Sequence, residues 1–407
     1  MSENSVRAEV SPAPDVTSAE PPDTRSHIAA LDGLRFIAAA CVLIAHGYHY
    51  LILLQDNTKI SSYNAPILAL STVGMTLFFS LSGFVIHYNY ASSVSLPGGK
   101  RAFAVARFAR LYPLFLLVFS VDTLRLLHHA DGKTDLLGPL PLFLTFTDSW
   151  WFWAFGDRVA DQAYSNASTV MWSLSTEAFF YVIYPVVAPL LRRLTGSRLL
   201  LAGAAVALIG MVLTTQVIGH RAGLIEWAQV YTGNPAAAAQ FPAWIFFNSP
   251  WLRVFEFLLG AIAAQYVMSG GADSRRMRVA CRAALILLAS AYIYTNINLM
   301  PISGGITTCL GFTFAIVIAA SATSATGPLR LLSSRWMVRG GQASYSLYLL
   351  HYWVMHDIGH KLADHLPTAV RFLLFLVLMV VAVAVSQVSY RFFERPATRF
   401  TRKLLSP

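Results

Sequence analysis

The chain is divided into a series of long apolar stretches separated by short polar loops. A helix needs about 20 apolar residues to cross the hydrocarbon core of a bilayer, and a single soluble core does not use so many runs of that length. Charged residues make up 12% of the chain, about half the share that soluble domains carry. The apolar stretches lie at residues 36–54, 66–88, 111–127, 170–191, 199–218, 250–268, 283–300, 302–322, 343–360 and 369–390.

The Lys and Arg residues are concentrated in alternate loops between these stretches. A net charge of +10 could indicate a nucleic-acid partner, but alternating basic loops are how a membrane protein fixes its orientation. The sequence therefore predicts an all-α polytopic bundle of about ten transmembrane helices with cytoplasmic N- and C-termini, a lipid partner and no nucleic acid. The outer loops hold few basic residues, namely Lys59, Lys133, Arg158, Arg221 and Lys361.

An eleventh apolar segment, 139–156, does not fit this charge pattern. It is interrupted by Pro139, Pro141 and Asp148 and ends in a Trp/Phe cluster of the kind found at membrane interfaces. Counting it as a span would move the following basic loop to the outer side. We therefore predict that 128–169 is an outer segment whose aromatic part lies on the membrane or dips into it.

The chain divides into three regions. Residues 1–27 are rich in Pro, Ser, Asp and Glu and are expected to form a disordered cytoplasmic tail. Residues 28–395 are expected to form the transmembrane domain, and 396–407 a basic cytoplasmic tail. The sequence has no CxxC or HExxH spacing, so no metal site is expected.

The first span carries two ionisable groups on one face. Arg35 and His46 are 11 residues apart, which is about 20° past three full turns and about 16 Å along the axis. Asp32 lies on the same stripe. This places an anion-binding group near the inner surface and a proton acceptor deep in the membrane, where ionisable residues are costly and often functional. A topology anchor and a hydrogen-bonded core histidine are the equally weighted alternative.

Two further patterns lie near the inner side. Arg107 and Arg110 share one helix face at i, i+3 and could grip phosphates, although ordinary positive-inside charge explains them as well. The small residues Ser80, Ser82 and Gly83 allow either close helix packing or contact with a ligand.

Polar residues also mark two later spans. The fourth span begins with Trp172, Ser173 and Ser175 and continues to Glu177, a carboxylate expected just below the outer surface. Such a group could orient a histidine or hold a sugar hydroxyl, or it could simply be hydrated at the interface. His351 lies within the ninth apolar stretch, where a hydrogen-bonded core histidine is the favoured interpretation.

Together these segments resemble the acyltransferase 3 family of integral-membrane O-acyltransferases. The matching segments are LDGLRFIAAACVLIAH at 31–46, FFSLSGFVI at 78–86, RFARLYP at 107–113, WSLSTEAFFYVIYP at 172–185 and SYSLYLLHYWV at 344–354. The resemblance implies a ten-helix enzyme that moves an acyl group from cytoplasmic acyl-CoA to a hydroxyl, usually on a sugar, at the outer face.

The resemblance also implies roles for individual residues. The family's Arg-x10-His motif falls on Arg35 and His46, and its Arg-x-x-Arg motif on Arg107 and Arg110. The motif at Trp172 ends on Glu177, and Tyr112 and His351 lie in the matching segments as supporting residues. Acyl-CoA, in the simplest case acetyl-CoA, is the expected co-substrate, with no tightly bound cofactor, and the bacterial cytoplasmic (inner) membrane is the expected location.

These residues predict direct acyl transfer. His46 acts as the general base on the acceptor hydroxyl, and Arg35, Arg107 and Arg110 hold the CoA phosphates. The pantetheine arm passes Ser80 to Gly83, whereas Glu177, with Trp172, Ser173 and Ser175, stands on the acceptor side. The alternative is a secondary transporter that uses intramembrane His and Glu as a proton relay.

Reporter fusions test the predicted topology. Fusions at Gly132, Asn234 and Pro367 should report an outer location, because they fall in loops with few basic residues. Fusions at Ser197, Asp273 and Pro407 should report a cytoplasmic location. A cytoplasmic signal at Gly132 together with an outer signal at Ser197 would show that 139–156 crosses the membrane.

Overall fold

The computed structural model describes residues 27–56, 65–129, 140–151, 170–270, 274–297, 304–323 and 327–406, and these residues form helices and no strand. An apolar environment without water requires each backbone polar group to be paired within the chain, and helices meet that requirement locally. Of the tail predicted at residues 1–27, residues 1–26 lie outside the described residues. The all-α prediction is confirmed.

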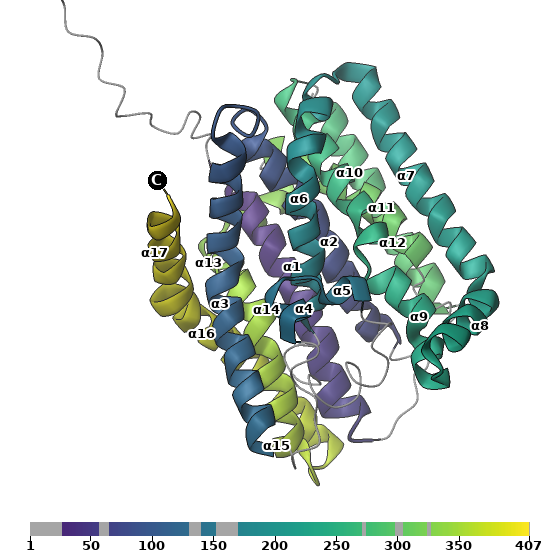
Figure 1. Cartoon of the computed structure of the whole chain (residues 1–407), viewed down its shortest axis with the longest axis vertical. Helices are drawn as coiled ribbons and strands as arrows, with labels where there is room; N and C mark the ends of the chain where they lie inside the picture. Colours follow the sequence, from purple (N-terminus) through teal and green to yellow (C-terminus); the bar gives the residue numbers. More distant parts are fainter. Residues whose placement is uncertain are drawn as a thin grey trace, which may run out of the picture.

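The helices form one bundle (Figure 1). Helices α1 and α2 run through its centre, α7 and α10 to α12 lie to one side, and α3, α16 and α17 lie to the other. The elements are α1 Ala29–Tyr48, η1 His49–Leu53, α2 Ala65–Tyr90, α3 Gly99–His129, α4 Leu140–Leu144, α5 Asp148–Trp151, α6 Trp172–Arg192, α7 Gly196–Gly219, α8 Arg221–Thr232, α9 Pro235–Phe247, α10 Pro250–Met268, α11 Ser274–Ile297, α12 Gly304–Thr323, η5 Gly327–Ser333, α13 Arg335–Gln342, α14 Ser344–Tyr352, η6 Trp353–His360, α15 Lys361–Ala363, α16 Thr368–Ser389, η7 Tyr390–Glu394 and α17 Arg395–Leu405.

Seven helical segments in the described residues are long and apolar enough to cross a membrane. They are Ala29–Leu53, Ala65–Tyr90, Gly99–Arg125, Trp172–Arg192, Gly196–Gly219, Ala238–Met268 and Thr368–Leu405. The other three predicted spans correspond to α11, to α12 and to α14 with η6. The chain therefore has the helices of an integral membrane protein.

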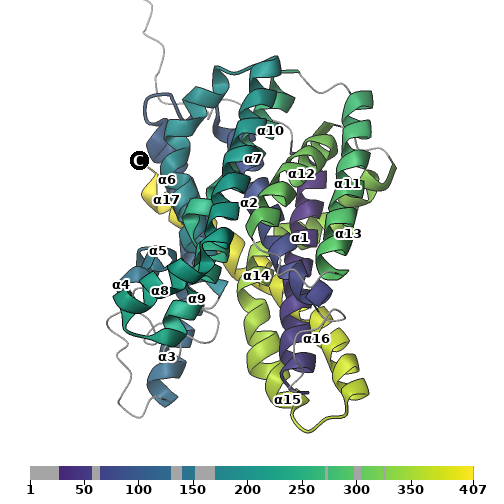
Figure 2. The same cartoon turned by 90° about the vertical axis from the view of Figure 1, so that its right-hand side faces the viewer.

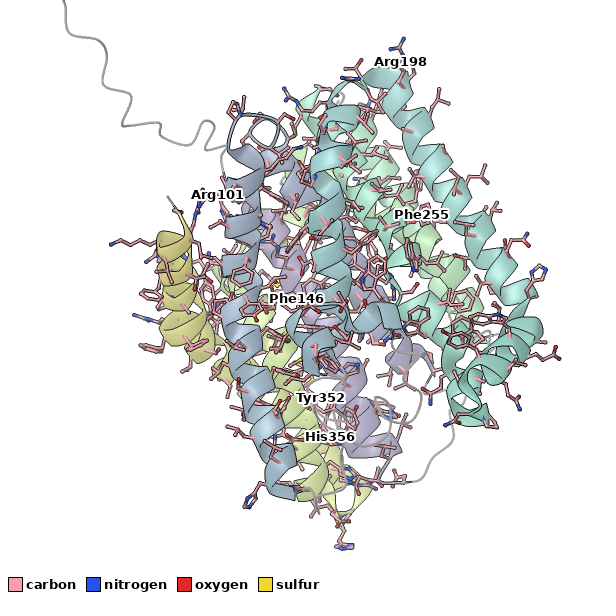
Figure 3. The ribbon with its side chains drawn as sticks, in the orientation of Figure 1. Arg101, Phe146, Arg198, Phe255, Tyr352 and His356 are labelled. Carbon is pink, nitrogen blue, oxygen red and sulfur yellow. The ribbon has the colours of Figure 1, made fainter. Side chains whose placement is uncertain are left out.

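The described part of segment 139–156 forms two short helices, α4 and α5. Phe143 is buried, and the ring of Phe146 lies 4.7 Å from that of Phe115 on α3. Figure 3 shows Phe146 near the middle of the bundle, and Figure 2 shows α4 and α5 gathered with α8 and α9 on one side of its lower half. The described part of this segment thus packs against the bundle, and its position on or in the membrane stays a prediction. Residues 152–169 lie outside the described part of the chain.

Helices α2 and α10 approach each other so closely that their backbones nearly touch. A Cβ on Gly83 would stand 1.9 Å from the carbonyl oxygen of Phe257, and a Cβ on Gly260 would stand 1.9 Å from that of Ser80. Small residues at membrane helix contacts permit this approach, which gains dispersion energy and interhelical hydrogen bonds. Thr76 on α2 donates such a bond, 3.2 Å long, to Glu256 of α10, which also pairs with Arg253 at 2.7 Å.

The α2–α10 contact predicts a specific instability. Gly260→Ala should lower the melting temperature of the detergent-solubilised protein, because the new methyl group meets backbone and not a movable side chain. Overpacking of this kind costs roughly 1–3 kcal/mol. Gly203→Ala on α7 is the matched control, since its Cβ would meet only Ile262 Cγ2 at 3.7 Å. Equal melting temperatures for the two variants would contradict the close approach.

Candidate active site

A pocket lies among α1, α2, α3, α6 and α14, and it gathers residues that are far apart in the sequence. Three guanidinium groups and one carboxylate line it, together with hydroxyl and aromatic side chains. The lining includes Arg35, Phe78, Phe79, Ser82, Arg107, Arg110, Ser173, Glu177, Tyr181, Ser344, Tyr345 and Tyr348. Six of the candidate site residues identified from the sequence therefore line one pocket.

The predicted pair on α3 lies in this pocket with each guanidinium held by a different partner. Arg107 donates a 2.8 Å hydrogen bond to the hydroxyl of Tyr90 and lies over its ring, 4.8 Å from the centroid. Arg110 donates a 2.6 Å bond to Glu394, which is 1% exposed. The i, i+3 spacing does place both groups on one face, as expected.

Arg107 retains an unused donor. Its Nε atom is buried and has no hydrogen-bond partner among the described residues. Buried polar atoms of this kind are uncommon in folded proteins and call for a partner. Arg35 is held from the other side by Asp32 at 3.2 Å, and it lies within electrostatic range of both α3 arginines and of Glu177. The pocket lining thus contains three positively charged side chains and one negatively charged side chain, that of Glu177.

Glu177 is placed differently from the expectation. The sequence put it on the acceptor side near the outer surface, but it lines the same pocket as the arginines. It accepts hydrogen bonds from Ser82 at 3.1 Å and from Tyr181 at 2.5 Å. The cause is α5, which covers the first turn of α6: Ser149 donates a 2.7 Å bond to Ser175, so this turn lies inside the bundle.

His46 and His351 form a hydrogen-bonded pair. His46 Nδ1 lies 2.8 Å from His351 Nε2, and His351 Nδ1 lies 2.6 Å from the carbonyl oxygen of Tyr348. A carbonyl oxygen only accepts, so Nδ1 of His351 must carry a proton. When both rings are neutral, His351 Nε2 then accepts from His46 Nδ1, and the lone pair remains on His46 Nε2. The geometry therefore selects which nitrogen of His46 is basic.

Tyr348 separates this histidine pair from the pocket. Its ring lines the pocket, and its centroid lies 5.9 Å from that of His351. Its hydroxyl lies 2.8 Å from Ser173 Oγ, which also lines the pocket. Glu177 does not hydrogen-bond to His46, so the orienting partner of His46 is His351 and not the expected carboxylate.

Several predicted site residues lie outside the pocket lining. Gly83 and the backbone of Ser80 lie in the close contact with α10, and only Ser82 of that group lines the pocket. Trp172 packs on Phe79 with ring centroids 6.1 Å apart.

The remaining predicted residues have structural partners. Ser175 bonds to Ser149, as described above, and is fully buried. Tyr112 stacks on Phe108 with centroids 4.4 Å apart. Asp32 accepts from Arg35 and lies 2.8 Å from His27 Nε2. The supporting role of Asp32 and Tyr112 stays a prediction.

Sequence reasoning missed the partners supplied by the C-terminal part of the chain. Glu394 accepts from Arg110 through one oxygen and from Ser346 through the other, both at 2.6 Å. Tyr345, whose hydroxyl donates to the backbone of Leu111, lines the pocket. The sequence signal that could have identified Glu394 is that it is a single carboxylate within the basic C-terminal segment.

Comparison with known proteins identifies relatives. A family model described as an acyltransferase domain matches residues 28–391. The chain is 28% identical over 386 residues to acyltransferase MdmB of Streptomyces mycarofaciens, and the match covers 91% of each protein. No solved structure matches the chain.

Two other relatives are longer than this chain. The chain is 25% identical over 395 residues to the protein named "Putative peptidoglycan O-acetyltransferase YrhL" of Bacillus subtilis, covering 91% of this chain and 55% of that protein. It is 22% identical over 392 residues to "Putative O-acetyltransferase SACOL0978" of Staphylococcus aureus, covering 91% of this chain and 57% of that protein. The chain thus spans little more than half the length of these two relatives.

Proposed function

Because the chain belongs to the acyltransferase 3 family, we propose that it is a membrane-embedded O-acyltransferase that uses cytoplasmic acyl-CoA, in the simplest case acetyl-CoA. The acceptor is a hydroxyl, on a sugar of a surface glycan, a glycolipid or a glycosylated metabolite. The observation that carries this proposal is the position of the His46–His351 pair beside a pocket lined by three guanidinium groups.

The proposed topology has ten spans with both termini in the cytoplasm, in the bacterial cytoplasmic membrane. It is supported by the position of basic residues, since Arg101 and Arg198 lie at the same end of the bundle in Figure 3. Excess Lys and Arg mark the cytoplasmic side of a membrane protein. The end that carries Arg101 and Arg198 is therefore the inner end, and the opposite end of the bundle faces outward.

In the proposed mechanism the pocket lined by Arg35, Arg107 and Arg110, here called the arginine pocket, binds the acyl-CoA donor. CoA carries several phosphate groups, and guanidinium groups bind phosphate through charge-assisted, often bidentate, hydrogen bonds. Arg35 and Arg110 already have carboxylate partners, whereas Arg107 has an unused buried donor, so Arg107 supplies the most direct phosphate contact. Glu177, in the same pocket, accepts hydrogen bonds from the amide N–H groups of the pantetheine arm.

The transfer step uses the basic nitrogen of His46. Nε2 of His46 takes the proton of the acceptor hydroxyl while the hydroxyl oxygen attacks the carbonyl carbon of the thioester. The carbon–sulfur bond then breaks, and the CoA sulfur takes the proton from the His46 imidazolium. The products are the ester and CoA thiol, so no net proton is released. His351 is a positioning residue that holds His46 in the required tautomer through the Tyr348 carbonyl.

Removal of the proposed base tests the function directly. His46→Ala should lower the rate of acetylated product formation by roughly 10²–10⁴-fold, the usual contribution of a general base. His351→Ala should have a smaller effect, because it removes orientation but leaves the base. Product is measured by mass spectrometry in cells, and thioester cleavage is measured with purified protein and acetyl-CoA. His365→Asn is the matched control, since the His365 side chain is 92% exposed. Near-full product from folded His46→Ala protein would place the base elsewhere.

Lysine substitutions test the donor pocket. Arg107→Lys and Arg110→Lys should each weaken binding of acetyl-CoA by roughly 1–3 kcal/mol, because lysine keeps the charge but loses the planar fork. The weakening should shrink as salt rises, since the phosphates are reached from water. Calorimetric titration of the purified protein measures both effects. Arg101→Lys on the same helix, where the side chain is exposed and outside the pocket, is the control. Wild-type affinity in both pocket variants would mean that these arginines only set topology.

A further inference from the structure

Two π-helical segments lie against each other immediately beyond the histidine pair. Segment η1 begins three residues after His46, and η6 begins two residues after His351. The two segments are in contact. A π-helix gives up the regular i→i−4 bonding of the α-helix and is frequent at functional sites. Both segments that follow the paired histidines are π-helical, which points to a function at this end of the pair.

These segments carry a cluster of imidazole and phenol rings, which we call the outer ring cluster: His49, Tyr50, Tyr352, His356 and His360. The ring of Tyr50 lies 4.8 Å from that of His356, and Tyr352 stacks on His356 at 4.9 Å. The rings of His356 and His360 are nearly parallel, 6.0 Å apart. Figure 3 shows Tyr352 and His356 in the half of the bundle away from Arg101 and Arg198.

The outer ring cluster lies next to the histidine pair. The ring of His46 lies 6.4 Å from that of Tyr50, and Tyr352 directly follows His351. Tyr348, which faces the arginine pocket, contacts His351 from within the same helix. The pair therefore stands between the arginine-lined pocket and the outer ring cluster.

Hydrogen bonds fix the rings of the cluster in place. His356 Nδ1 lies 2.9 Å from Asp357, whose other oxygen pairs with Arg125 of α3. His360 Nδ1 lies 2.9 Å from the side-chain amide of Gln55. The cluster is nevertheless partly accessible, because the side chain of His356 is 29% exposed and Tyr50 is half-buried. Fixed, partly open groups of this kind are what a binding surface requires.

The chemistry of the cluster fits a hydroxylated ring. A sugar presents apolar C–H faces, which stack on aromatic rings, and hydroxyl edges, which bond to phenol and imidazole groups. Binding sites typically combine an aromatic lining with a few placed polar groups, as found here. No group of three His, Cys, Asp or Glu side chains in the described part of the chain has the arrangement of a metal site.

We propose that the outer ring cluster is the acceptor subsite, where a sugar packs against His356 and Tyr50, whose rings meet edge to face, and presents one hydroxyl to His46. This inference rests on the proposed acyltransferase function. It moves the acceptor away from the beginning of α6, where the sequence had placed it, to the junction of η1 and η6. The donor and acceptor then reach His46 from opposite ends of the bundle.

The test separates acceptor binding from donor binding. Cells that lack their own copy receive the wild-type chain, His356→Leu, His356→Phe or the exposed control His365→Asn, and acetylated product is measured by mass spectrometry. The same full-length proteins are purified and titrated with acetyl-CoA, and size-exclusion profiles establish that they are folded. His356→Leu should lower the product about tenfold, the equivalent of one or two lost contacts. It should leave acetyl-CoA affinity unchanged, and His356→Phe, which keeps a ring, should lie between wild type and His356→Leu.

Each other outcome has a defined meaning. Wild-type product from both His356 variants would overturn the acceptor assignment. Parallel loss of product and acetyl-CoA affinity would also overturn it, because His356 would then support the whole bundle. If the wild-type protein itself does not bind acetyl-CoA or form product, the proposed acyltransferase function is refuted. This outcome is distinguishable from failure of the acceptor assignment.

Discussion

The hydrocarbon core of a bilayer contains no water, so every polar group placed there must find its partner within the protein. Most of the charged groups in this bundle obey that constraint. Arg253 and Glu256 are each 1% exposed and pair with one another, with Thr76 joining α2 to them. Pairing is incomplete in the pocket, where Arg107 Nε is buried without a partner among the described residues, and also at Arg371 Nε and Nη1 outside it. The pocket differs from that second place because two further guanidinium groups, those of Arg35 and Arg110, line the same space.

The helices and the arginine–histidine stripe could be predicted from the sequence because the information is local. Apolar length predicts a helix wherever a span is needed, and each of the ten predicted spans overlaps a helix in the described residues. Arg35 and His46 share one helix, as do Arg107 and Arg110, so residue spacing alone fixes which groups face the same way.

The partners of these groups could not be predicted, because they come from distant parts of the chain. His351 is 305 residues from His46, and Glu394 is 284 residues from Arg110. Nothing in the apolar pattern states which spans are neighbours. The position of Glu177 in the same pocket as the arginines could not be predicted for a related reason: the apolar pattern does not show that α5 packs on the first turn of α6. The π-helical segments also have no signal in the apolar period, since they differ from α-helix only in hydrogen bonding.

One buried carboxylate connects the two sides of the proposed reaction. Glu394 holds Arg110 of the donor pocket through Oε1 and Ser346 of α14 through Oε2. Ser346 lies five residues, about one and a half turns, before His351 on that helix. A shift of Glu394 would therefore move Arg110 and the helix that carries His351 together. Both oxygens are used and the side chain is 1% exposed, so the carboxylate cannot exchange either partner for water. The relative position of the α3 and α14 motifs is thus set by Glu394 of η7, a residue that lies in none of the motifs that mark the site in the sequence.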